Sequence, residues 1–116
     1  MALTVTIWHN PRCGKSRETL RLLEARGLKP VIRLYLSDPP HPDEIRTARD
    51  LLGVQALGMM RVKEAAFRDA GLTRGSDEEL LISAMAAQPI LIERPIVFAN
   101  GRAAIGRPPE AVLAIL

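Results

Sequence analysis

Apolar and β-branched residues alternate along the first part of the chain in a pattern that predicts a strand, a helix and a second strand. Residues 3–8 form the first strand and residues 31–36 the second. Between them, apolar side chains recur at helical spacing from Lys15 to Arg26, and Gly27 fits the left-handed position just past a helix end. Two strands joined by a helix in so short a segment should be parallel.

The middle of the chain has helical rather than strand periodicity. Residues 37–42 must be irregular, since three of them are prolines. Helices are predicted over residues 43–52, 63–70 and 76–88. The last of these begins with a capping-box pattern, Ser76-Asp77-Glu78-Glu79.

The last part of the chain returns to strands. Residues 96–99 and 102–105 lie on either side of Asn100-Gly101, which is the best two-residue signal for a hairpin turn. Pro108 suits the first turn of a C-terminal helix, which we predict over residues 109–116.

This order of elements predicts an α/β fold in one domain, residues 1–116. Without its central helices the chain is thioredoxin-like, with a parallel strand pair, an antiparallel hairpin and flanking helices. The strands would then form a mixed four-stranded sheet. The central segment, about residues 43–88, is interpreted as a helical insertion in that fold.

Composition limits the location of the protein and its classes of function. No apolar run approaches the roughly 20 residues that span a bilayer, and the first five residues do not resemble a signal peptide, so we expect a cytoplasmic protein without a membrane partner. The net charge is +3, but the basic residues are scattered and aromatic residues make up only 3% of the chain, so nucleic-acid binding is not expected.

A single cysteine, Cys13, excludes an internal disulfide and any metal site that needs several thiolates.

Cys13 lies between the predicted first strand and the helix that follows it. Ligands of open α/β sheets bind beyond the carboxyl ends of strands, and a helix start offers free backbone N–H groups and the positive end of a dipole. These features favour a thiolate and can also hold an oxyanion. A lone cysteine is more often buried and inert, but the polar neighbours Arg12, Lys15 and Ser16 favour a reactive thiol.

His9 and Arg17 stand four residues before and four residues after Cys13. Arg17 is one helical turn from the cysteine, where its charge can stabilise a thiolate. His9 can form a hydrogen bond within the loop or tune the thiol. The alternatives are an ordinary solvated helix residue for Arg17 and a loop-capping group for His9.

Five segments spread over essentially the whole chain form a recognisable set. They are His9-Asn10-Pro11-Arg12-Cys13-Gly14-Lys15-Ser16-Arg17-Glu18-Thr19-Leu20, Tyr35-Leu36 with Pro39-Pro40, Met59-Met60-Arg61, residues 89–97, and Ile105-Gly106-Arg107-Pro108-Pro109. Together they resemble the signatures of the glutaredoxin-coupled arsenate reductases, the ArsC family. The resemblance is strong to a housekeeping branch of that family.

The resemblance implies a site and a reaction. It implies that Cys13 is the nucleophile and that Arg61, Arg94 and Arg107 surround an oxyanion, arsenate or a similar one. Guanidinium groups suit such a ligand because each donates paired hydrogen bonds. It also implies a cis bond between Arg94 and Pro95, as thioredoxin-like folds have beside the active thiol.

Because the chain has no second cysteine, an external thiol must complete the reaction. The resemblance implies glutathione as cosubstrate, followed by glutaredoxin. It implies no bound cofactor and no metal.

Two other interpretations stay open, and a third is rejected. A glutathione-dependent thiol oxidoreductase with another substrate would need Cys13 but not three arginines. A regulator that binds RNA polymerase would typically carry a CxxC turn, whereas this chain has Ser16 at the second position. A phosphatase-like loop needs Cys-x5-Arg, and the spacing from Cys13 to Arg17 excludes it.

Overall fold

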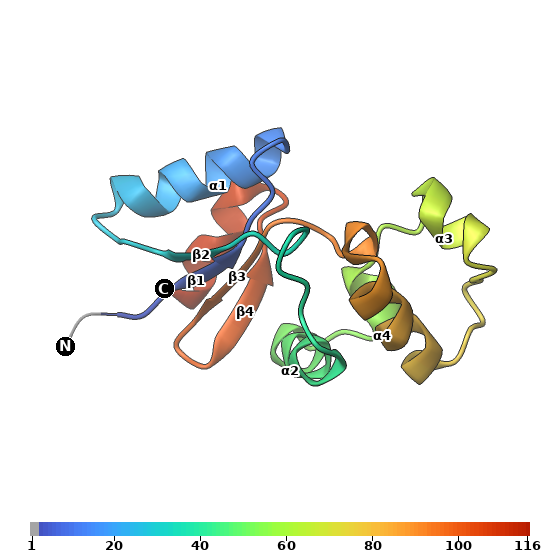
Figure 1. Ribbon diagram of the computed structural model, residues 1–116. Coiled ribbons are helices and arrows are strands. Elements are labelled where there is room, and N and C mark those ends of the chain that lie inside the picture. Colours follow the sequence, from blue (N-terminus) through green and yellow to red (C-terminus); the bar gives the residue numbers. More distant parts are fainter. Residues whose placement is uncertain (1–2) are drawn as a thin grey trace. The chain divides into compact units, whose positions relative to one another are not determined.

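A computed structural model describes residues 3–116 (Figure 1). Met1 and Ala2, which belong to the start interpreted above, lie outside the described residues. The chain divides into two compact units: one combines the described residues up to Asp38 with Arg94–Leu116, and the other is Pro39–Glu93. The second unit begins earlier and ends later than the predicted insertion, and the single domain stays a prediction.

The first unit contains the mixed four-stranded sheet that the sequence predicted. Its strands are β1 (Thr6–Trp8), β2 (Val31–Arg33), β3 (Ile96–Ala99) and β4 (Arg102–Ile105). They lie in the order β2-β1-β3-β4. β1 and β2 are parallel, as expected for a βαβ unit, while β3 is antiparallel to both of its neighbours.

The second strand is shorter than predicted. It ends at Arg33, and the residues after it form a turn in which the N–H groups of Ser37 and Asp38 both donate to the carbonyl of Leu34. The prediction of a strand to residue 36 was therefore wrong at its end. The turn buries Tyr35. β2 is also an edge of the sheet, and it exposes Val31 and Ile32.

The predicted hairpin is confirmed, with its two-residue turn at Asn100 and Gly101. Asn100 and Gly101 have φ angles of 55° and 67°, and these two positive values are what a tight two-residue hairpin turn requires. The Asn100 side chain also donates a 2.9 Å hydrogen bond to the carbonyl of Ile115. The turn is thereby tied to the end of the chain.

Helix α1 (Gly14–Ala25) and the 3-10 helix η3 (Pro109–Ile115) complete the first unit, and both lie over one face of the sheet (Figure 1). The C-terminal helix was predicted, although its 3-10 geometry was not. Between these helices and the sheet lies a core of buried aliphatic side chains: Val5, Ile7, Leu23, Val97, Ala99, Val112 and Ile115. The core fixes the start of α1 at the carboxyl end of β1, where Cys13 stands.

The second unit is helical. It consists of α2 (Pro42–Leu52), η1 (Ala56–Met59), α3 (Ala65–Asp69), α4 (Glu78–Ala87) and η2 (Pro89–Leu91). α2 packs against α4. The buried apolar side chains of this unit are Ile45, Ala48, Ala56, Met59, Met60, Phe67, Leu72, Leu81, Ile82, Met85, Leu91 and Ile92.

The acidic side chains at the start of α4 bond to residues of α2 and η1 and do not form a capping box. Glu79 forms a 2.9 Å ion pair with Arg46 of α2, and Glu78 accepts a 2.6 Å hydrogen bond from the N–H of Ala56. Asp77 is the N-cap residue, and the Ser76 hydroxyl accepts from the N–H of Thr73 instead. The predicted capping box was therefore wrong, because Ser76 lies one residue before the N-cap and bonds within its own turn, while Glu79 pairs with Arg46 of α2.

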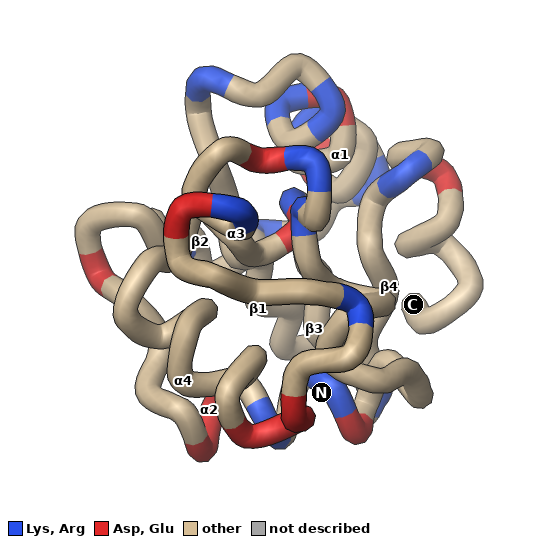
Figure 2. Tube along the Cα trace, turned by 90° about the vertical axis from the view of Figure 1, so that its right-hand side faces the viewer, with Lys and Arg blue, Asp and Glu red and all other residues tan. Residues whose placement is uncertain are grey.

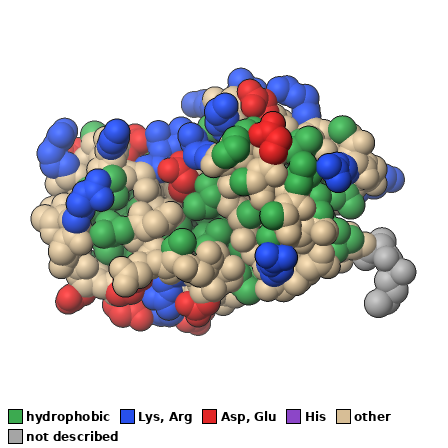
Figure 3. Space-filling model, turned by 180° about the vertical axis from the view of Figure 1, so that it is seen from behind, with side chains coloured by type: hydrophobic (Ala, Val, Ile, Leu, Met, Phe, Trp, Pro, Cys, Tyr) green, Lys and Arg blue, Asp and Glu red, His purple; other side chains and the backbone are tan. Residues whose placement is uncertain are grey.

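Lys and Arg residues are spread along the chain (Figure 2). Charged and apolar side chains are mixed on the face of the molecule that Figure 3 shows. Among residues 3–116, every helix is too short or too polar to cross a lipid bilayer.

Replacing Gly106 with Ala should destabilise the first unit. The added Cβ would lie 2.5 Å from Oγ1 of Thr19 and 2.8 Å from Cγ of Pro95, so both side chains would have to move away from residue 106. We expect the free energy of unfolding to fall by about 1–3 kcal/mol, as for other overpacked sites. Urea denaturation measures this. Gly75→Ala is the matched control, since its Cβ would meet nothing closer than 3.7 Å, and equal stability of the two variants would contradict the prediction.

Candidate active site

The loop after β1 places Cys13 at the N-cap of α1. The Cys13 N–H donates to the carbonyl of Asn10 at 3.0 Å, and the Arg12 N–H donates to the side-chain Oδ1 of Asn10 at 3.0 Å. Asn10 therefore shapes the turn with both its backbone and its side chain. The Cys13 carbonyl accepts the first helical hydrogen bond, from Arg17. The sulfur is thus held at the start of the helix, as predicted from the sequence.

Cys13 is largely buried, with 9% of its surface exposed. Burial raises the pKa of its thiol, but hydrogen bonds from the N–H of Ser16, from the Arg94 side chain and from the N–H of Lys15, together with the Arg94 charge, outweigh that effect. The net result is a Cys13 pKa below the ordinary value for a thiol. The thiolate is stabilised by the donors that a helix start supplies and by one guanidinium group.

Two of the predicted arginines lie at the sulfur. Nη2 of Arg107 is 3.6 Å from Sγ of Cys13, while Nε of the same guanidinium donates to the carbonyl of Arg94 at 2.9 Å. Arg94 donates a side-chain hydrogen bond to the thiolate, and its Nε and Nη1 atoms are shielded from solvent. Three residues that are far apart in the sequence therefore meet within the first unit.

The backbone around these arginines explains how they meet. The N–H of Gly106 donates to the carbonyl of Pro95 at 2.9 Å, which holds the segment after β4 against the segment before β3. The Arg94–Pro95 bond is cis, as predicted. The Arg107–Pro108 bond is also cis, which the sequence did not lead us to expect.

Ser16 is a site residue that the sequence did not reveal. Its side chain is fully buried, and its Oγ lies 2.7 Å from Nδ1 of His9 and accepts a 3.0 Å hydrogen bond from the N–H of Asn10. Burial and the nearby charge of Arg17 lower the pKa of His9, which favours the neutral ring. The Nδ1 atom of a neutral ring can accept a hydrogen bond from the Ser16 hydroxyl. The only signal for Ser16 was its position three residues after Cys13.

His9 and Arg17 each join the loop before Cys13 to helix α1. His9 forms its hydrogen bond with Ser16 of α1, rather than within the loop. Nη1 of Arg17 donates to the carbonyl of Pro11 at 2.8 Å, so Arg17 braces the loop that leads to Cys13. A direct effect of either side chain on the thiol stays a prediction.

Arg61 lies in the second unit. Its N–H donates to the carbonyl of Leu91 at 2.8 Å, and its Nη1 forms a 2.8 Å ion pair with Glu64. The structure thus brings Arg94 and Arg107 to Cys13, whereas Arg61 belongs to the other unit.

This arrangement has the chemistry that a nucleophile beside an anion-binding site would need. The thiolate stands beside guanidinium groups and helix-start N–H groups, which are the donors that bind tetrahedral oxyanions. Within residues 3–116 no cluster of three or more His, Cys, Asp or Glu side chains could hold a metal ion.

The sheet, with a single cysteine at its first helix and arginines at the sulfur, is that of a thioredoxin-like protein with one active-site thiol. The chain belongs to the ArsC family, whose family model matches residues 8–115.

Named relatives are similar over the whole length. The chain is 49% identical over 118 residues to the Uncharacterized protein YfgD of Escherichia coli (strain K12), covering 100% of this chain and 99% of that protein. It is 46% identical over 114 residues to an arsenate reductase of Neisseria meningitidis serogroup B, covering 97% of each. The solved structure of arsenate reductase from Vibrio cholerae has a TM-score of 0.97 at 46% identity and covers 100% of both chains.

The Cys13 thiol should titrate below the roughly 8.5 of a free cysteine, and replacing Arg94 with Ala should raise its pKa. The variant removes both a hydrogen bond to the thiolate and a positive charge beside it. Thiolate absorbance measured against pH tests both statements. Arg21→Ala, at an exposed position on α1, is the control and should leave the titration unchanged. A thiol that titrates at 8.5 or above, or an Arg94 variant identical to the parent, would contradict the assignment.

Proposed function

We propose that this chain is an arsenate reductase in which the Cys13 thiolate is the nucleophile and Arg61, Arg94 and Arg107 bind the oxyanion. One observation carries the proposal: two guanidinium groups from distant parts of the sequence converge on the single thiol at a helix start. A thiol that only exchanges disulfides does not need such a concentration of positive charge. Relatives named arsenate reductase, at 46% identity, support the same substrate.

The first step is nucleophilic attack. The Cys13 sulfur forms a bond to arsenic, and one oxygen leaves as water or hydroxide. Arg94, Arg107 and the N–H groups of Lys15 and Ser16 hold the remaining oxygens and stabilise the charge that develops on them. Arg61 is the third arginine in this proposal, as the family resemblance implies.

The later steps transfer two electrons to arsenic. A sulfur–arsenic bond breaks, its electron pair stays on arsenic, and the sulfur forms a disulfide with a second thiol. Overall, arsenate loses one oxygen as water and becomes arsenite, while two thiols become one disulfide. The second thiol must come from another molecule because Cys13 is the single cysteine of the sequence. Glutathione is the proposed cosubstrate, and glutaredoxin then restores the Cys13 thiol in the reducing cytoplasm.

Arsenate-to-arsenite turnover with glutathione and glutaredoxin should be detectable with the parent chain and absent with Cys13→Ser. A serine hydroxyl is a far weaker nucleophile, and no second thiol can replace the lost one. Replacing glutaredoxin with thioredoxin is the donor control and should give much slower turnover. Residual turnover by Cys13→Ser would show that the nucleophile is assigned incorrectly.

Replacing Arg61, Arg94 or Arg107 singly with Ala should lower kcat/KM for arsenate. Each change removes a charge-assisted hydrogen bond to an anion, which is worth about 1.5–3 kcal/mol, or roughly ten- to a hundredfold in rate. Arg21→Ala should turn over like the parent. Alkylation of Cys13 by a neutral reagent checks that each variant keeps an accessible thiol.

Parent-like turnover in all three arginine variants would remove the physical support for arsenate. The chain would then be better described as a glutathione-dependent thiol oxidoreductase with another substrate, which requires Cys13 but not the arginines.

A further inference from the structure

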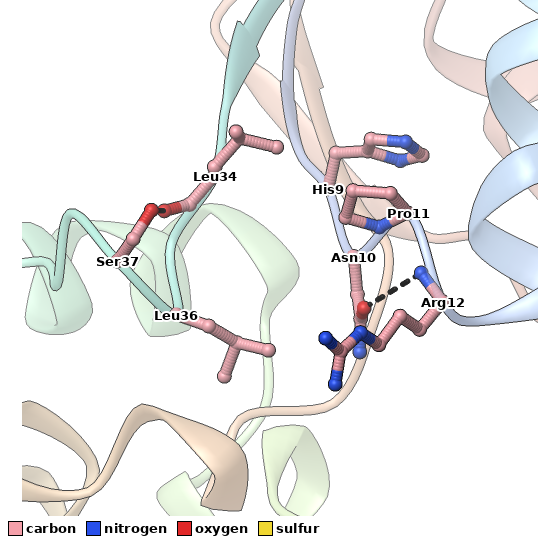
Figure 4. A pocket seen from close by; sticks show the side chains of 7 residues that line it. All are labelled: His9, Asn10, Pro11, Arg12, Leu34, Leu36 and Ser37. Atoms are coloured by element: carbon pink, nitrogen blue, oxygen red, sulfur yellow. Dashed lines mark hydrogen bonds between the residues drawn. The ribbon is translucent and has the colours of Figure 1, made fainter.

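A cavity of about 420 Å³ lies within the first unit, between the loop that precedes Cys13 and the turn that follows β2. This volume is in the range of small-molecule sites. Seven residues line the cavity: His9, Asn10, Pro11, Arg12, Leu34, Leu36 and Ser37. In Figure 4 the loop residues face the turn residues across it. The proposed reaction as described so far makes no use of this cavity.

The two walls differ in character. Leu34 and Leu36 on the turn are 44% and 42% exposed, so the turn presents apolar side chains to a ligand in the cavity. Opposite them, Asn10 and Arg12 present polar side chains (Figure 4). A ligand that contains both methylene groups and carboxylates could therefore satisfy both walls at once.

Arg12 gives the cavity its charge. Its side chain is exposed, and among residues 3–116 its guanidinium group makes no hydrogen bond or ion pair, so it is available to a carboxylate. Arg12 also directly precedes Cys13, and the same Asn10 that binds the N–H of Arg12 accepts from the N–H of Cys13. A ligand held on Arg12 is thus held next to the reactive thiol.

We propose that this cavity binds glutathione, the external thiol that the proposed function requires. In this arrangement a glutathione carboxylate pairs with Arg12, and its methylene groups pack on Leu34 and Leu36. The Asn10 side chain and the Ser37 hydroxyl bind its peptide groups. The inference rests on the proposed function for the identity of the thiol. It adds a second site to the protein, separate from the arginines that bind the oxyanion.

The test uses S-methylglutathione, which has both carboxylates but no free thiol and so cannot react. Added to the full-length protein at up to about 10 mM, enough to fill a millimolar site, it should shift the amide NMR signals of residues 9–12 and 34–37. Arg12→Gln should weaken binding about tenfold, because it removes a charge-assisted hydrogen bond. Leu36→Asn should weaken it about fivefold through lost apolar contact.

Arg21→Gln is the matched control, because it also removes one exposed arginine charge from the first unit but lies outside the cavity. It should bind like the parent. If the amide shifts are absent or fall elsewhere, or if Arg12→Gln and Arg21→Gln bind alike, the proposal is overturned.

Kinetics separate this inference from the proposed function. In the arsenate assay, Arg12→Gln should raise the KM for glutathione about tenfold, leave the KM for arsenate unchanged, and leave turnover with 2-mercaptoethanol, which has no carboxylate, unchanged. If Arg12→Gln slows only the step in which glutaredoxin restores the Cys13 thiol, the cavity binds glutaredoxin instead, and the glutathione site is overturned. If the parent binds S-methylglutathione in the cavity but reduces no arsenate, the proposed function fails while the site stands.

Discussion

A thiolate that is largely removed from water needs hydrogen-bond donors and positive charge in place of the water it has lost. Cys13 meets this requirement with the N–H groups of the first turn of α1 and the guanidinium of Arg94. The rest of the first unit holds these donors in position. The core beneath α1 fixes the helix start, and the contact between Gly106 and Pro95 brings both arginines to the sulfur. Without these donors, burial would favour an inert neutral thiol.

The local parts of the fold could be predicted from the sequence because neighbouring residues determine them. The Asn100-Gly101 turn and the parallel pair around α1 are of this kind. The end of β2 could not be predicted, since apolar residues such as Leu34 suit a strand and a surface turn equally well. The capping box failed for a different reason: the partner of Glu79 is 33 residues away in sequence.

The candidate site shows the same division. The position of Cys13 between a strand and a helix was sufficient to suggest its chemistry. Arg107 lies 94 residues from Cys13, and no spacing rule joins residues so far apart. Only the family resemblance suggested their contact. Ser16 was missed because a serine near a helix start is ordinarily a capping residue, whereas here its hydroxyl connects His9 to the backbone of Asn10. The loop from His9 to Arg12 also has two sides, one that positions the thiol and one that lines the cavity.

The edge strand β2 has a consequence for the behaviour of the protein in concentrated solution. Exposed apolar side chains such as Val31 and Ile32 on a sheet edge favour pairing with the edge of another copy, which is how β-rich aggregates start. Here the strand is only three residues long, and it follows directly on Lys29 and Pro30. Pro30 has no N–H to offer an incoming strand, and the charge of Lys29 repels a second copy in the same register. A short strand that begins after a proline and a lysine is thus a poor template for a second copy, even though its side chains are apolar.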